Sequence, residues 1–230
     1  MVAKHDLGSC VVRHESSSLS GVTEKMIVHF IWVGNQKISQ PFLSNLENFK
    51  SLNGDEEILE WDEEHLLPLI KSYGREDLYL SSSIFHKLQI ARYTILDYYG
   101  GIYTDYDVEW KVPIKEGLGS RIEKDLCLIK RRSLYFYKRE ESVLRMDLLD
   151  DYVIFAKPGI TNGFIDYSLN RAIDKTRIKE CQTEPFSVYS LTEWVHDSKL
   201  NFGFFDHTEI YDGGECKIAL HANKKTWEGK

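Results

Sequence analysis

One continuous stretch, residues 84–105, most constrains how this chain can fold. Its first part carries apolar residues at spacings of four, three and four positions: Ile84, Leu88, Ala91 and Ile95. That spacing is typical of a helix that buries one face. Gly100-Gly101 is expected to end the helix, because glycine readily takes the left-handed conformation of a helix cap. Ile102–Asp105 then has the composition of a β-strand. The stretch therefore predicts a helix that turns directly into a strand.

The remainder of the chain repeats this alternation. The apolar run Met26–Val33 predicts a buried strand. Pro41 suits the first turn of a helix that continues to Leu52. Further strands are expected at 57–61, 107–110, 125–130, 134–137, 152–156 and 217–221, and further helices at 62–70, 164–173 and 188–196. Alternating strands and helices predict an α/β fold. We expect one domain, residues 26–230, after a polar tail, residues 1–25.

Composition excludes several classes of protein. The net charge of −7 and the pI near 5.6 argue against general binding of nucleic acid. The four cysteines form no C-x-x-C pair, which argues against a zinc site or a redox pair. No apolar run reaches the roughly 18 residues of a membrane span, and residues 1–25 lack the apolar core of a signal peptide. We expect a cytoplasmic protein, free or peripheral to the membrane.

Asp105-Tyr106-Asp107 is the strongest candidate for chemistry. With 16 Asp in 230 residues, roughly one D-x-D triplet is expected by chance, so a solvated acidic turn is the simpler interpretation of the triplet alone. Its position is more informative, because ligands of α/β sheets bind beyond the carboxyl ends of strands. If the segment is extended, Asp105 and Asp107 face the same way. The two carboxylates would then suit Mg²⁺ or Mn²⁺.

Three other side chains are candidates, each with an ordinary structural alternative. His221 ends the last expected strand and suits a metal shell, although a core or surface histidine is the simpler reading. Arg92, one turn after Gln89, needs a partner if it is half-buried. Either a structural carboxylate or a substrate diphosphate would serve. Trp32 could stack on a nucleobase or could be a core residue.

The segment Lys130–Arg139 mixes basic and aromatic residues. Such a mixture can bind nucleic acid or an anionic acceptor, but a solvated hairpin edge is the simpler interpretation. The motifs G-x-x-x-x-G-K-[ST], G-x-G-x-x-G, G-x-S-x-G and H-E-x-x-H are all absent from the sequence. Their absence removes the best-marked routes to kinase, dehydrogenase, hydrolase and metalloprotease chemistry.

Three segments resemble glycosyltransferase family 32, whose sugar-binding region contains a D-x-D motif. Gln89–Val108 reads QIARYTILDYYGGIYTDYDV and resembles the family's central signature, with the arginine, the glycine pair and both aspartates at matching spacing. Val28–Gly34 resembles the opening strand of the family, and also the start of the glucosyltransferase domain of large clostridial toxins. His221–Trp227 has the span of the closing motif. The matches frame about 200 residues, from Val28 to Trp227.

The resemblance implies a GT-A fold, a single mixed, mostly parallel sheet flanked by helices. It also implies an Mn²⁺ or Mg²⁺ cofactor and a UDP- or GDP-linked sugar donor. A hexose would pass, with retention of configuration, to a glycan, lipid-linked or protein acceptor. Assembly of a polysaccharide is one setting that fits.

The family's residue roles carry over to matching positions. Trp32 would stack on the base, and Arg92 would meet the phosphate or sugar. Asp105 would contact ribose and metal, and Asp107 would be the principal metal ligand. His221 and Thr226 would close over metal and diphosphate. The donor pocket would also include Val33, Tyr103 and Trp227.

The sequence departs from the family at specific positions. Gln89 stands where the family has an aspartate that holds sugar hydroxyls, so the identity of the sugar is open. The closing motif has Ala222, Lys225 and Thr226 in place of histidine, glycine and serine. Two other functions use the same residues: a nucleotidyltransferase or phosphohydrolase, and a non-catalytic protein that binds nucleotide-sugars.

Overall fold

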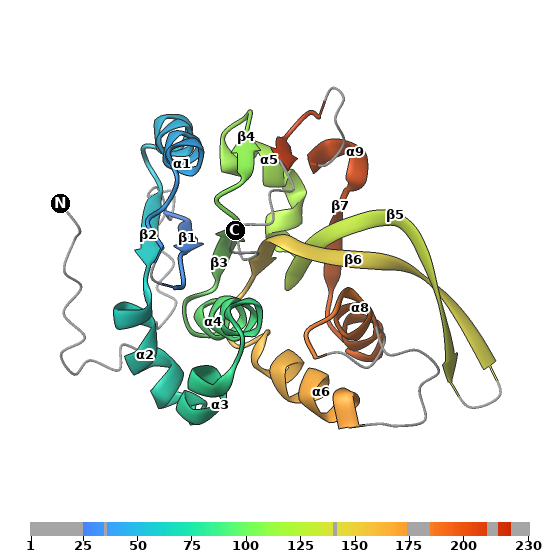
Figure 1. The fold of residues 1–230 in the computed structure, drawn as a ribbon. Helices are drawn as coiled ribbons and strands as arrows, with labels where there is room; N and C mark the ends of the chain where they lie inside the picture. The colour runs from blue at the N-terminus through green and yellow to red at the C-terminus, as the bar shows by residue number, and fades with distance from the viewer. Residues whose placement is uncertain (1–24, 35, 140–141, 174–184, 211–215, 222–230) are drawn as a thin grey trace, which may run out of the picture.

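The computed structural model describes residues 25–34, 36–139, 142–173, 185–210 and 216–221, with the backbone alone for 132–139, 142–144 and 172–173. A six-stranded sheet, in the order β2-β1-β3-β6-β5-β7, forms its centre (Figure 1). Its strands are β1 (Ile27–Ile31), β2 (Glu57–Trp61), β3 (Gly101–Thr104), β5 (Leu126–Arg139), β6 (Ser142–Ala156) and β7 (Phe202–Asp206). Only β6 runs antiparallel to its neighbours in this sheet. The predicted α/β fold with a mixed, mostly parallel sheet is confirmed.

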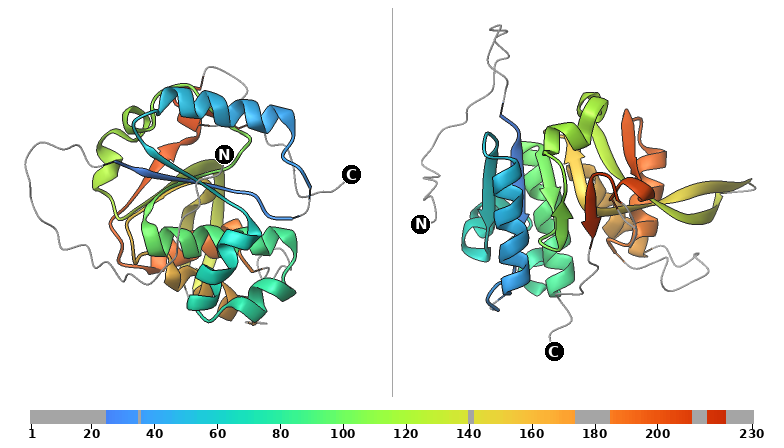
Figure 2. Two further views of the ribbon diagram at one scale, coloured as in Figure 1. Left: turned by 90° about the vertical axis from the view of Figure 1, so that its left-hand side faces the viewer. Right: turned by 90° about the horizontal axis from the view of Figure 1, so that it is seen from above.

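Helices cover both faces of the sheet (Figures 1 and 2). One face carries α2 (Glu63–Ser72), α3 (Glu76–Ser81), α4 (Ile84–Tyr99), α6 (Asn162–Ile173) and α8 (Val188–Asp197). The other carries α1 (Gln40–Leu52), α5 (Ile114–Leu118), α9 (His207–Ile210) and the ribbon of β4 (Val108–Trp110) and β8 (Ala219–His221). A short 3-10 helix, η1 (Gly119–Glu123), follows α5.

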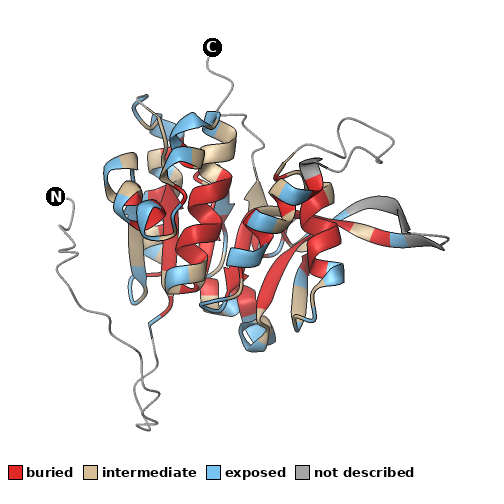
Figure 3. Cartoon of the chain, turned by 90° about the horizontal axis from the view of Figure 1, so that it is seen from below, coloured by how far each residue is buried: buried red, intermediate tan, exposed pale blue. Residues whose placement is uncertain are grey.

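Alternation along the strands divides the buried residues into two large clusters. On β3, Ile102 packs toward α1 and α5, whereas Tyr103 packs toward α4. On β5, Cys127 and Ile129 belong to the same cluster as Ile102, whereas Leu126 and Leu128 belong to the cluster of Tyr103. Successive strand side chains point to opposite faces, so a sheet covered on both sides needs nearly continuous apolar strands. Figure 3 shows the resulting buried layer.

Several predicted boundaries are confirmed. Strand β2 matches residues 57–61, and helices α4 and α2 begin close to the expected positions. Their first turns are capped by Ser83, which accepts from the His86 amide, and by Asp62, which accepts from the His65 amide. The buried side of α4 is wider than the expected stripe, since residues 89–96 are all buried between the sheet and its neighbouring helices. Sequence patterns did not reveal α3, α5, β7 or α9, three of which are helices of only 4–6 residues.

Strands β5 and β6 are longer than the sequence indicates. The two segments expected at 125–130 and 134–137 are one strand, and its hairpin with β6 extends well beyond the rest of the sheet (Figures 1 and 2). The basic and aromatic segment 130–139 therefore lies in a β-hairpin, as the simpler interpretation held. Among the described residues, no helix is long and apolar enough to cross a membrane.

Buried His29 joins β1 to β2 and α4. It is fully buried, with Nε2 2.8 Å from the Gly100 carbonyl oxygen, and the Trp61 indole N–H donates to Nδ1 at 3.2 Å. A neutral ring protonated at Nε2 satisfies both contacts, whereas a second proton would face the Trp61 N–H. Burial lowers the pKa of His29 to about 4, although the bond to Gly100 opposes the shift.

This depressed pKa predicts a loss of stability in acid. Unfolding returns the His29 pKa to 6.5, so the unfolded chain binds the proton first as pH falls. The stabilisation is complete above pH 6.5 and should fall by about 3 kcal/mol as pH approaches 4. Urea unfolding of the natural chain and of His29→Gln, compared from pH 7 to 4, measures this loss as a decreasing difference between their free energies of unfolding. A difference that does not change with pH would show that His29 does not titrate as described.

Candidate active site

The site is built where α4 turns into β3. The Gly100 amide closes α4 onto the Leu96 carbonyl, and Gly100 and Gly101 have φ values of 65° and 90°. A Cβ on residue 101 would collide with the carbonyl oxygen of Ile27, which β3 passes closely as it pairs with β1. Both glycines are needed, because the turn requires positive φ and the strands require close approach. The turn directs β3 so that Asp105 follows its carboxyl end.

Asp105-Tyr106-Asp107 forms a turn, so the expectation of an extended segment is wrong. The Val108 amide donates to the Asp105 carbonyl at 3.2 Å, and Asn45 Nδ2 donates to the Tyr106 carbonyl at 3.1 Å. Tyr106 is 6% exposed and packs against Phe30. Burial of this aromatic ring between the two aspartates bends the chain. The carboxylates converge through the turn and not through strand alternation.

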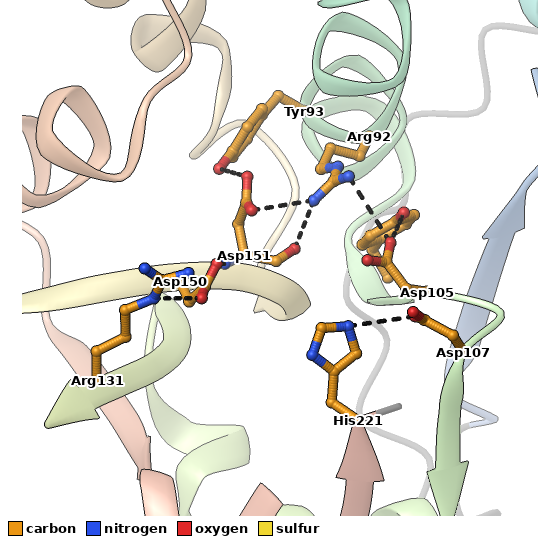
Figure 4. A network of polar contacts seen from close by, with 9 residues as sticks. Arg92, Tyr93, Asp105, Asp107, Arg131, Asp150, Asp151 and His221 are labelled. Atoms are coloured by element: carbon orange, nitrogen blue, oxygen red, sulfur yellow. Dashed lines mark hydrogen bonds and ion pairs between the residues drawn. The ribbon is translucent and has the colours of Figure 1, made fainter. Parts of the chain in front are cut away.

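His221 joins the two aspartates, as predicted. Ligand atoms of Asp105, Asp107 and His221 all lie within 4.8 Å of one another, and His221 Nε2 is 3.3 Å from Asp107 Oδ1 (Figure 4). The strand that carries His221 is not part of the main sheet. Val108 pairs directly with His221 in the separate β4–β8 ribbon, so cross-strand pairing brings residues 107 and 221 together.

Arg92 lies behind the aspartates. Its Nη1 donates to the Asp151 carbonyl oxygen at 2.7 Å and lies 3.1 Å from Asp151 Oδ1, and its Nη2 is 3.7 Å from Asp105 Oδ1 (Figure 4). Its guanidinium lies 4.5 Å from the ring centroid of Tyr103, whose hydroxyl donates to Asp105. Two kinds of partner were considered for Arg92, a structural carboxylate and a substrate diphosphate, and in the structure its partners are carboxylates. At 3% exposure, Arg92 holds Asp105 from within the core.

Three further residues are functional candidates that the sequence patterns did not indicate. Asp150 and Asp151 stand on β6 beside the site, and Arg131 stands on β5 (Figure 4). Tyr93 donates to Asp151 Oδ2 at 3.0 Å, and Arg131 Nε donates to Asp150 Oδ2 at 2.5 Å. Tyr152 stacks on His221 at 4.0 Å between ring centroids. A pair of aspartates inside an otherwise apolar strand, 149–156, was the available signal.

Crowding of acidic groups changes their proton affinity. Burial raises the pKa of Asp105 to about 6, with Asp107 adding to the shift and Arg92 opposing it. Burial likewise raises the pKa of Asp150 despite the Arg131 charge. For His221, burial acts to lower the pKa, but the hydrogen bond and charge of Asp107 outweigh it and the pKa is raised above 6.5. The cluster therefore favours bound cations, whether protons or a metal.

The remaining predicted residues lie around this cluster. Trp32 is half-buried, donates from Nε1 to the Gln36 carbonyl at 2.6 Å, and meets the Tyr106 ring edge-on at 5.8 Å. Val33 is half-buried on the opposite face, and Gln89 is 2% exposed. Gln89 Oε1 has no hydrogen-bond partner within the described part of the chain. Thr226 and Trp227 lie outside the described residues.

Comparisons with known proteins place this site in a family. The family described as "Glycosyltransferase sugar-binding region containing DXD motif" matches residues 5–124, which include Trp32, Arg92 and both aspartates. No curated protein matches the chain significantly.

Chains of solved structures also match, 18 in number. One, "PaToxG Glycosyltransferase", is 15% identical, with a TM-score of 0.42 over 75% of this chain and 69% of that chain. The family match covers more than half of the 230 residues and contains the acidic turn around which the site is built. This protein therefore belongs to the family of glycosyltransferase sugar-binding regions that contain a DXD motif, and it is a glycosyltransferase.

Proposed function

We propose that this glycosyltransferase is metal-dependent and transfers a hexose from a UDP- or GDP-sugar with retention of configuration. The observation that carries the proposal is the convergence of Asp105, Asp107 and His221 on one point, with ligand atoms within 4.8 Å of one another. The acceptor is a glycan, lipid-linked or protein hydroxyl. The proposal extends the family membership to a cofactor, a donor and a stereochemical course.

The residues fit Mn²⁺ or Mg²⁺. Two carboxylates and one imidazole form a mostly hard ligand set, and a site with three protein ligands leaves positions for phosphate oxygens. Asp105 and Asp107 face each other in an acidic chain, so a divalent cation would relieve their repulsion. When bound, the ion would supply Lewis-acid stabilisation to the departing diphosphate.

The surrounding residues position the donor and its charges. Arg92 and Tyr103 fix Asp105 from the core, so its carboxylate keeps one orientation. Gln89 has a buried oxygen that lacks a partner among the described residues, which supports its role as an acceptor of a hydrogen bond from a sugar hydroxyl. Trp32 packs on Tyr106 within the acidic turn, which supports its role beside the nucleobase.

The arrangement favours a front-side mechanism. The Asp151 carboxylate forms an ion pair with Arg92 and accepts from Tyr93. The Asp150 carboxylate accepts from Arg131 and from the Asp151 amide, so both carboxylates are engaged. Neither is presented as a nucleophile. The bond from the sugar to the diphosphate breaks through an oxocarbenium-like state while the acceptor oxygen attacks from the same face. The departing phosphate oxygen takes the acceptor's proton.

A donor panel tests the proposal. UDP-, GDP- and CMP-sugars are tested by thermal shift with and without Mn²⁺, and the products of the best donor are identified by NMR. The proposal expects a shift that requires Mn²⁺, followed by release of nucleoside diphosphate and transfer of the sugar. Release of free phosphate or a nucleotidyl conjugate would favour phosphoryl chemistry. Binding without turnover would favour a non-catalytic protein.

Trp32→Ala is expected to weaken Mn²⁺-dependent binding of UDP or GDP about tenfold or more. Stacking of a base on an aromatic ring contributes roughly 1–3 kcal/mol. The ring also packs on Phe42 and Tyr106, so the variant is compared with Trp32→Phe, which keeps an aromatic face. Calorimetry measures both affinities. A Trp32→Ala chain that is less stable yet binds normally would assign the ring to packing alone.

Mn²⁺ binding should weaken as pH falls. Because the ion binds the deprotonated ligands, protons compete with it. The pKa of His221 is raised above 6.5 and that of Asp105 to about 6, so affinity should drop at least about tenfold between pH 7.5 and 5.5. Titrations of Mn²⁺ across this range measure the slope, and His221→Ala should make it shallower. A flat profile would contradict coordination by these groups.

A further inference from the structure

Arg131 differs from the other arginine of the site. Arg92 is almost fully enclosed, and its two Nη nitrogens are directed at Asp151 and Asp105. The Arg131 side chain is 43% exposed, and among the described residues its hydrogen bond is the one from Nε to Asp150 Oδ2. In the described part of the chain its two Nη nitrogens make no hydrogen bond. These outward N–H groups can meet a ligand while Nε stays anchored.

A bulge in the hairpin places Arg131. Lys130 pairs with Leu149 and Leu134 pairs with Asp147, so three residues of β5 stand opposite a single residue of β6. Arg131 is the first residue of this bulge. Bulges break the alternation of side chains and often redirect one toward an active site. The bulge explains why Arg131 contacts Asp150 of the acidic cluster although β5 continues into the projecting hairpin.

Through Asp150, Arg131 belongs to the network of polar contacts drawn around the proposed metal ligands in Figure 4. Figure 4 shows Asp150 and the Arg131 guanidinium on one side of His221, with Asp107 on the other side. The charge of Asp150 is one of several that raise the pKa of His221, after the hydrogen bond and charge of Asp107. Arg131 thus belongs to the polar network around the proposed metal ligands without being one of them.

We propose that Arg131 binds the diphosphate of the donor through its Nη nitrogens and stabilises the departing nucleoside diphosphate. The inference rests on the proposed function and adds a residue to it. As the bond from the sugar carbon to the phosphate oxygen breaks, that oxygen takes the electron pair. The new bond forms to the acceptor oxygen, and the acceptor's proton goes to the phosphate. Arg131 stays protonated and moves no proton.

The chemistry of the group supports this assignment. A guanidinium is charged at every relevant pH and presents a planar fork that matches phosphoryl oxygens. The site holds four carboxylates, Asp105, Asp107, Asp150 and Asp151, and a diphosphate brings further negative charge. Arg92 is already enclosed among carboxylates. Arg131 is the accessible cation among the described residues drawn together in Figure 4.

Calorimetric titration of UDP and GDP in the presence of Mn²⁺ tests the proposal. Arg131→Ala should weaken binding of the nucleoside diphosphate at least tenfold and leave binding of the bare nucleoside unchanged. Lys130→Ala is the matched control, because Lys130 is the neighbouring cation and pairs with Asp147 away from the cluster. A double variant, Arg131→Ala with Asp150→Asn, avoids leaving a buried carboxylate without its partner and should show the same loss.

The outcomes separate the two proposals. A double variant that folds and binds the diphosphate as tightly as the natural chain overturns the role of Arg131 alone. Loss of affinity in Lys130→Ala equal to that in Arg131→Ala would also overturn it, since the effect would then be general charge. If the natural chain binds neither diphosphate with Mn²⁺, both the donor assignment and the role of Arg131 fail.

Discussion

Asp107→Asn is expected to reduce Mn²⁺-dependent release of nucleoside diphosphate at least hundredfold while the chain stays folded. Asparagine keeps the size of the side chain but removes the charge that would hold the ion. A hundredfold loss corresponds to about 3 kcal/mol of transition-state stabilisation. Steady-state kinetics with the best donor and acceptor measure the effect. The variant should unfold no earlier than the natural chain, because it relieves repulsion with Asp105.

Asp125→Asn is the matched control. Asp125 lies at the amino end of β5, whereas Asp105 follows the carboxyl end of β3, which runs in the same direction. Asp125 pairs with Lys157 at 3.0 Å, and its loss should not change turnover. Normal kinetics in Asp107→Asn, at Mn²⁺ concentrations that saturate the natural chain, would remove this residue from the proposed metal site.

Arg92→Met is expected to lower the free energy of unfolding by about 3–5 kcal/mol. Breaking a buried ion pair by removing one partner leaves an uncompensated charge in the core. Arg92 is 3% exposed and lies beside the carboxylates of Asp151 and Asp105, so both would lose a cation. Urea unfolding at pH 7.5 measures the loss. For a chain of this length, the melting temperature should fall by roughly 10 °C.

Two comparisons identify the cause of that loss. Arg145→Met removes an exposed arginine of β6 and should change stability by no more than about 0.5 kcal/mol. Asp151→Asn added to Arg92→Met should recover part of the loss, because it removes one orphaned charge. An Arg92→Met chain as stable as the natural one would mean that these contacts do not support the fold.

Much of the fold could be predicted from local patterns. The helix over 84–99 was evident because its apolar spacing and its terminal glycines agree. The hairpin of β5 and β6 was underestimated for the opposite reason. Its bulges interrupt alternation near residues 131–133 and 151–154, and its outer part continues past the other strands, where burial no longer imposes an apolar pattern.

The site was predictable where it depends on sequence spacing. Asp105 and Asp107 were found as a triplet after a strand, and His221 through its place in the last strand. The turn between the aspartates was not foreseen, because it depends on burial of Tyr106 against Phe30, a tertiary contact. Asp150, Asp151 and Arg131 were missed because no spacing links them to residues 105–107. Pairing of β6 with β3 and β5 brings them there.

The central claim is that Asp105, Asp107 and His221 hold one divalent cation that receives the donor's diphosphate. Electron paramagnetic resonance measures it most directly, because the signal of free Mn²⁺ decreases as the ion binds. Titration of the natural chain with Mn²⁺ and a nucleoside diphosphate should show one bound ion per chain. His221→Ala should bind the ion more weakly. Asp107→Asn should leave the signal of free Mn²⁺ at the level that the nucleoside diphosphate gives without protein. Equal uptake of Mn²⁺ by all three chains, or none by the natural chain, would contradict the account.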